Sequence, residues 1–246
     1  MQPICLPPTL TDLFEEAWRV VVPKIAPDTH VLLPDHRASF TFIGGYPFGP
    51  NTVLFSGPSR QARIVPMIPG QVYAGVAIRP GAAIALGLDP IQNHLPLTLP
   101  SLAMGLERAA ECGRTAELEH ALQMLKADAR AVDPVVAAMV ANIRQDAHQV
   151  PARSSGTRLS ERQCRRRFVR AVGLSPKAFE ATLRLRNAMI DGIIMPATSV
   201  ASIASAHGYA DQPHFGRAVH EAFQAPPREV RKSLQQTRER FLNSTR

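Results

Sequence analysis

The chain has 246 residues, of which 45% are hydrophobic and 20% charged, and a formal net charge of +8, a composition that excludes a disordered protein. No run approaches the roughly 20 uncharged apolar residues of a membrane span, and the first ten residues lack the basic start and apolar run of a secretion signal. Three widely separated cysteines argue against a disulfide framework or a thiolate zinc site, so we expect a cytoplasmic protein.

Short extended segments separated by turns fill the first hundred residues, which hold 15 of the 22 prolines. The segments are rich in β-branched and aromatic residues and are divided by Pro and Gly, which is typical of an all-β sandwich or small barrel. In the last segment apolar residues alternate from Val72 to Ile78, which predicts a strand with one buried face. The predicted strands cover residues 18–22, 30–33, 38–43, 52–55, 63–68 and 71–78.

From Ser101 the apolar pattern becomes helical. Leu102 and Leu106 share one helix face before Gly113 interrupts the run, and a second helical run begins at Leu118. We expect these two helices to pack on the β-rich segment or on a second copy of it. Together with the strands they form a first predicted domain, residues 1–132.

The second predicted domain, residues 133–246, carries all of the excess positive charge. Residues 1–132 hold 10 basic and 11 acidic side chains, whereas residues 133–246 hold 18 basic and 9 acidic ones. Only Lys177 and Lys232 among those 18 bases are lysines. Because arginine forms paired hydrogen bonds with phosphates and guanine edges, this half is predicted to bind a polyanion.

The second of two helix-turn-helix units is predicted at about residues 199–223. A short helix from Ser199 ends at a Gly208 turn, and Asp211 then caps a second helix, the element that enters the DNA major groove in such units. Phe215, Val219 and Phe223 recur at helical spacing and are predicted to face the core. The opposite face presents the candidate DNA-binding residues Gln212, Pro213, Gly216 and Arg217, together with His220.

The first unit is predicted at about residues 150–171, within SERQCRRRFVR and the residues before it. Ser160 is expected to cap its helix with Gln163 as the partner of a capping box, and Cys164 and Phe168 are expected to face inward. Several bases on one exposed face repel one another unless an anion is bound. The candidate DNA-binding residues on this face are Arg162, Gln163, Arg165, Arg166 and Arg170. The amides at the helix starts, near Ser160 and Asp211, are expected to hold phosphate.

Two runs, LSERQCRRRFVRAVGLSPKAF at 159–179 and ASIASAHGYADQPHFGRAVHEAFQAPPREVRK at 201–232, resemble the AraC/XylS-type transcription regulators. The resemblance covers about residues 133–233 and implies a seven-helix domain. Its two helix-turn-helix units would enter adjacent major-groove segments of double-stranded DNA, one turn or roughly 34 Å apart. It also implies contact with RNA polymerase if the protein is an activator.

The N-terminal half resembles the cupin-like sensor domains of some of these regulators, through HVLLPDHRASFTF and VAIRPGAAIALGL. The resemblance implies that this half binds a small-molecule effector of unknown identity and forms a homodimer. The fold class is therefore predicted as α+β with two domains, a β-rich cupin-like barrel with trailing helices followed by an all-α double helix-turn-helix domain.

The sequence predicts a transcription regulator and not an enzyme, because no nucleophile–base pair, phosphate-binding glycine loop or metal-ligand set is found. No cofactor or metal is predicted. The alternatives are a constitutive regulator whose N-terminal half only dimerises, a cupin-like enzyme with a DNA-binding tail, and a DNA-alkylation repair protein. A further hypothesis is that the first unit is loosely folded without DNA, because polar residues and Gly156 stand at 153–157 where the family has apolar ones.

Overall fold

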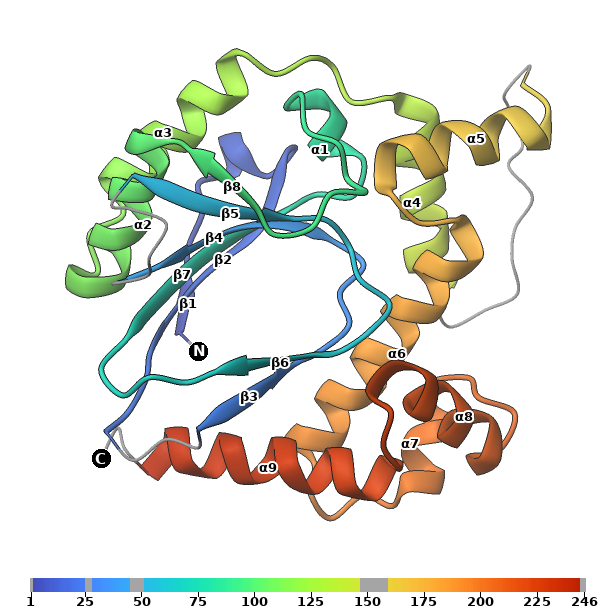
Figure 1. Cartoon of the computed structure of the whole chain (residues 1–246). Helices are drawn as coiled ribbons and strands as arrows, with labels where there is room; N and C mark the ends of the chain where they lie inside the picture. The colour runs from blue at the N-terminus through green and yellow to red at the C-terminus, as the bar shows by residue number, and fades with distance from the viewer. Residues whose placement is uncertain (1, 25–27, 45–50, 147–158, 244–246) are drawn as a thin grey trace.

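The computed structural model of the chain describes residues 2–24, 28–44, 51–146 and 159–243, and it places a β-rich half before a helical half (Figure 1). This order is the predicted one. The first half consists of β1 (Gln2–Ile4), η1 (Pro8–Leu10), β2 (Phe14–Val21), β3 (Thr29–Leu32), β4 (Ala38–Ile43), β5 (Thr52–Ser56), β6 (Arg63–Pro66), β7 (Val72–Ile78), α1 (Ala82–Ala85), β8 (Leu95–Thr98), α2 (Pro100–Cys112) and α3 (Ala116–Ala127). The second half consists of α4 (Pro134–Asp146), α5 (Glu161–Val172), α6 (Pro176–Ile194), α7 (Val200–Ala206), α8 (Gln212–Phe223) and α9 (Pro227–Asn243).

Six strands form one antiparallel sheet in the order β1-β2-β7-β4-β5-β8, and β3 and β6 form a separate two-stranded ribbon. The central strand β7 pairs with β2 and β4. The prediction of a single buried face for this strand is wrong from Ala74 onward, where both faces are buried. One reason is that Trp18 of β2 lies opposite Gly75, and a Cβ atom on Gly75 would lie only 2.5 Å from the indole ring.

The core of the β-rich half lies between the sheet and the helices α2 and α3, as predicted for the two helical runs. Leu102, Leu106, Leu118 and Leu122 are fully buried in one apolar cluster with side chains of β2, β4, β5 and β7. The two helices cross closely at Gly105, where a Cβ atom would lie 2.7 Å from the backbone of Leu118. A larger residue at this position would therefore push α3 away from the sheet.

The helical half has two smaller apolar clusters, which α6 joins. The first lies between α4, α5 and α6, where the rings of Phe168 and Phe179 meet edge to face at 5.7 Å. The second lies between α6, α7, α8 and α9 around Phe215 and Val219. The first cluster thus packs behind α5, and the second forms the core around α7 and α8. No helix in the described part of the chain has the length and apolar character needed to cross a membrane.

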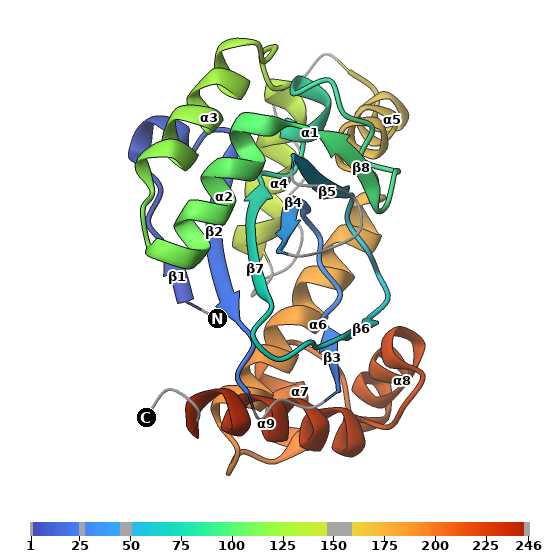
Figure 2. The same ribbon diagram turned by 60° about the vertical axis from the view of Figure 1, so that its left-hand side comes forward.

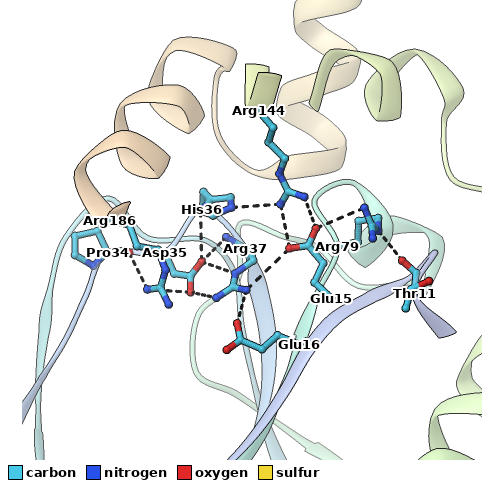
Figure 3. A network of polar contacts seen from close by, with 10 residues as sticks. All are labelled: Thr11, Glu15, Glu16, Pro34, Asp35, His36, Arg37, Arg79, Arg144 and Arg186. Atoms are coloured by element: carbon cyan, nitrogen blue, oxygen red, sulfur yellow. Dashed lines mark hydrogen bonds and ion pairs between the residues drawn. The ribbon is translucent and has the colours of Figure 1, made fainter. Parts of the chain in front are cut away.

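A cluster of charged side chains joins the two halves (Figure 3). Arg144 of α4 donates two hydrogen bonds to Glu15 of β2, and Arg186 of α6 lies 3.3 Å from Asp35. Within the β-rich half, Arg37 donates to both Asp35 and Glu16. The cluster therefore consists of arginines from both halves around three carboxylates of the first half.

Burial changes the acidity of several members of this cluster. Burial alone would raise the pKa of Asp35, but the hydrogen bonds from Arg37 and the charges of Arg37 and Arg186 lower it overall. Burial is the main reason that the pKa of His36 is lowered to about 3. The charges of the surrounding arginines lower this pKa further, and only the charge of Asp35 raises it. His36 is therefore neutral at pH 7, and its Nε2 atom lies 3.4 Å from Arg144 Nη2.

Candidate nucleic-acid interface

The first candidate helix, α5, begins at the predicted capping box. The Ser160 hydroxyl accepts a hydrogen bond from the Gln163 amide, and the Gln163 side-chain oxygen accepts one from the Ser160 amide at 2.8 Å. These two bonds satisfy donors that a helix start otherwise leaves unpaired. Because the Gln163 oxygen is occupied in this way, the side chain positions the helix start as well as lying on its exposed face.

The basic residues of α5 lie on its outer side, as helical geometry predicts. Cys164 and Phe168 are buried on the inner side, which confirms their predicted orientation. Arg167, which was not among the candidates, is exposed beside them and lies 3.5 Å from Asp133. The exposed candidates on this helix are Arg162, Gln163, Arg165, Arg166 and Arg170. They give α5 a strongly positive outer face.

The second unit is formed by α7 and α8, and both helices are capped by side chains at the predicted residues. Ser199 accepts a hydrogen bond from the Ser202 amide at 3.0 Å, and Asp211 accepts one from the His214 amide at 2.6 Å. Phe215 and Val219 are buried in the core of the unit, whereas Phe223 is only partly buried. The predicted inner face of α8 is therefore confirmed.

The outward side of α8 carries the remaining candidates. Gln212, Pro213, Arg217 and His220 are exposed, and Gly216 is half-buried. A Cβ atom on Gly216 would meet nothing within 4 Å, so the backbone there borders open space. This arrangement leaves room for a ligand to approach the backbone closely, which is the reason that Gly216 is a candidate DNA-binding residue.

The turns around α8 fit the sequence despite unusual residues. Gln224 ends the helix in the left-handed conformation, with φ of 55°, at a position where glycine is common. Tyr209, in the turn before α8, is buried against Phe215 and His214, and burial raises the pKa of its hydroxyl to about 12. Arg184 of α6 lies over its ring at 5.9 Å. The turn is thus anchored to α6.

Sequence reasoning missed a basic depression beside the start of α8. This depression has a volume of about 400 Å³ and lies between α7, α8 and α9. Gln212 lines it together with the exposed bases Arg228 and Lys232 of α9. Arg231, also at its wall, donates instead to the carbonyl oxygens of Gly192 and Met195 at the end of α6. The PPREVRK run contains these bases, and their charge was the available signal.

The two candidate helices lie at the same side of the molecule, with α6 running between them (Figures 1 and 2). The predicted first unit also includes residues 150–158. These residues, and with them the hypothesis of a loosely folded leading helix, lie outside the part of the chain that the structure describes.

Comparison with known proteins supports both halves of this architecture. Residues 154–233 match the family model described as a helix-turn-helix domain. Two crystal structures of ToxT from Vibrio cholerae share the fold at 10% sequence identity. One has a TM-score of 0.53 and covers 88% of this chain and 98% of ToxT, and the other has a TM-score of 0.51 and covers 89% and 98%. No curated protein sequence matches the chain. The resemblance inferred from the two motifs is therefore confirmed for this segment: residues 154–233 are an AraC-type helix-turn-helix domain.

Proposed function

We propose that the protein is a transcription regulator that binds specific DNA sequences through α5 and α8. The observation that carries the proposal is that two side-chain-capped helices of one AraC-type domain lie at the same side of the molecule, and that each carries exposed arginine. Arginine on a helix in the major groove can read guanine edges or hold phosphates.

The proposed DNA contacts divide into two groups. The residues that we expect to reach bases or phosphates are Arg162, Arg165, Arg166, Gln212 and Arg217. Gln163, Arg170, Pro213 and Gly216 complete the two surfaces, while Ser160 and Asp211 mark the helix starts whose amides hold phosphate.

We further propose that a small-molecule effector controls DNA binding through the β-rich half, and that the regulator is a homodimer of two domains, 1–132 and 133–246. The support is the resemblance of the first half to cupin-like sensor domains, together with the charged cluster through which it contacts α4 and α6. An activator of this type would also contact RNA polymerase. A constitutive regulator remains the second candidate, and a ligand-dependent shift in melting temperature or DNA affinity would discriminate against it.

The experiment that tests the proposal is selection of genomic DNA fragments by the full chain at two salt concentrations, followed by sequencing of the retained DNA. We expect enrichment of a motif with two half-sites one helical turn apart. Retention that is blind to sequence and disappears at the higher salt concentration would contradict specific recognition, because phosphate contacts alone produce that behaviour.

A further inference from the structure

The β-rich half contacts each helix-turn-helix unit separately. Ile84 of α1 packs into the apolar cluster that contains Phe168 of α5. Val31 and Leu33, in and after β3, pack against the other cluster, which contains Val219 of α8. Neither contact involves the outward faces of α5 or α8 that carry the candidate DNA-binding residues.

A continuous line of close contacts also runs from the end of α5 into the β-rich half. Gly173 ends α5 with φ of 84°, and a Cβ atom on it would lie 2.9 Å from the carbonyl oxygen of Pro90. Pro90 in turn lies against Gly57, where a Cβ atom would be only 1.9 Å from the same oxygen. The Gly57 amide donates to the Gln92 carbonyl at 2.8 Å, which ties the two loops together.

The same segment continues to the end of α8. Gly57 begins the connection from β5 to β6, which runs along the side of the β-rich half that faces α6 and α8 (Figures 1 and 2). At its other end the Ala62 amide donates to the carbonyl oxygen of Ala222 at 2.9 Å, in the last turn of α8. Arg60 Nη2 lies 2.5 Å from Glu221 Oε1 beside it. We name residues 57–62 with Pro90 the brace.

A depression of about 340 Å³ lies where the brace crosses between the two units. Arg60 and Gln61 of the brace line it together with Leu174, which follows α5, and Glu221 of α8. The brace therefore lies between the ends of α5 and α8, and it connects them by a route separate from α6.

We propose that the brace fixes the separation of the two recognition helices, so that the β-rich half determines which spacing of DNA half-sites the protein accepts. This inference rests on the proposed function. Two helices that enter adjacent groove segments must keep a fixed separation. Binding groups act together only when the residues packed around them keep them within about 0.5 Å of the productive geometry. The carbonyl oxygens at a helix end lack partners within the helix, so the bond from Ala62 is a suitable anchor.

The first test measures the separation without DNA. Spin labels are attached at Arg167→Cys of α5 and His220→Cys of α8, in a full chain that also carries Cys5→Ser and Cys112→Ser, and their distance distribution is recorded. The brace variant is Gly57→Ala, whose new methyl group must displace Pro90. The control is Gly70→Ala, which strains a backbone with φ of 80° but whose new methyl group meets nothing within 4 Å.

We expect a narrow distance distribution in the parent and in the Gly70→Ala chain, and a distribution at least about twofold wider, or displaced, with Gly57→Ala. Ala62→Pro, which removes the amide that bonds Ala222, provides a second brace variant if Gly57→Ala does not fold. Unchanged distributions in both brace variants would overturn the proposal and leave α6 alone to set the separation.

The second test measures spacing preference on DNA. The wild-type chain first selects a two-half-site duplex from a random library, and affinities are then compared on duplexes with one or two base pairs inserted between the half-sites. We expect the insertions to weaken wild-type binding by roughly tenfold or more and to weaken Gly57→Ala binding several-fold less. The two chains should bind a duplex that carries a single half-site equally well. Equal penalties would overturn the proposal. Failure of the wild-type chain to select any sequence would instead refute the proposed function, while the distance measurement still decides on the brace.

Discussion

Arg144 of α4 forms a paired contact with Glu15 of β2, from Nη1 to Oε1 at 2.6 Å and from Nη2 to Oε2 at 3.0 Å. The side chains are only 29% and 13% exposed, so this contact is shielded from water. The next arginines, Arg79 and Arg37, lie 3.7 and 4.0 Å from the same carboxylate. Arg144 is therefore the closest of the arginines around this buried charge.

We expect Arg144→Ala to lower the free energy of unfolding by about 2–3 kcal/mol, because it leaves Glu15 buried with only more distant partners. Arg144→Lys should lose about half as much, since an ammonium group cannot form the paired contact. Urea denaturation measures both. The control is Lys126→Ala, which removes a pair with Asp12 that is more exposed and should cost less than about 1 kcal/mol. Equal losses in Arg144→Ala and the control would contradict the prediction.

The unfolding free energy should also fall in acid because of His36. Its pKa is about 3 in the folded chain and 6.5 for an ordinary histidine, so the unfolded chain binds the extra proton between these pH values. The contribution of His36 to the free energy of unfolding is therefore fully present well above pH 6.5 and is lost as the pH falls. The loss from this group is about 2 kcal/mol between pH 7 and pH 5. Asp35, with its lowered pKa, adds a further loss of stability as the pH falls below 3.8, the ordinary pKa of an aspartate.

The pH dependence is measured by urea denaturation between pH 7.5 and 5, with His36→Gln as the test variant. The slope should decrease in this variant but not vanish, because burial also lowers the pKa of His30. An unchanged slope would show that His36 is not the titrating group.

The capping box of α5 can be tested at its first residue. Ser160→Ala should lower the free energy of unfolding by about 1 kcal/mol, whereas Ser160→Gly should cost only a few tenths. The reason for the difference is that glycine leaves the helix-start amides open to water. Thermal or urea denaturation distinguishes the two variants, and a Ser160→Ala chain as stable as the wild type would show that the side-chain bond to Gln163 contributes nothing measurable.

Arg217 provides the sharpest test of base recognition. If it forms a paired contact with a base, Arg217→Ala should weaken binding to the selected sequence by roughly 1–3 kcal/mol and leave binding to random DNA unchanged. Affinity measurements on both DNAs check this. Arg114→Ala, which removes an exposed arginine of the β-rich half, is the control and should bind both DNAs as the wild type does. Equal losses on both DNAs with Arg217→Ala would make it a phosphate contact.

Lys232 is expected to behave differently from Arg217, because a lysine beside the start of α8 suits a phosphate better than a base edge. Lys232→Ala should weaken binding uniformly on specific and random DNA and reduce the salt dependence, the slope of log K against log salt, by about 0.9. Titrations at several salt concentrations measure the slope. A loss confined to the specific sequence would contradict this role.

Six of the eight strands in the described part of the chain could be predicted from the sequence, and the reason the other two were missed is physical. β1 and β8 are the edge strands of the sheet, and each contains a proline, Pro3 and Pro96. Proline is tolerated at a sheet edge, where one side of the strand needs no ladder bonds, but it reads as a turn signal in the sequence. The central strands have no such interruption, so their alternation was visible.

The helix caps and inner faces of α5 and α8 could be predicted because they depend on residues within a few positions of each other. The contacts between the halves could not. Glu15 and Arg144 are 129 positions apart, and nothing in the local pattern of either residue indicates the other. The brace was also invisible, since Gly57 and Ala62 read as an ordinary polar turn between two strands.

Ile84 has a consequence for how the protein unfolds. It belongs to the β-rich half by position, yet it packs into the apolar cluster around Phe168 and so contributes to the core that holds α4, α5 and α6 together. A core that draws a side chain from each half cannot melt in one half alone without exposing apolar surface in the other. Calorimetry of the full chain should therefore record one cooperative heat-absorption peak, and the two halves should behave as a single thermodynamic body.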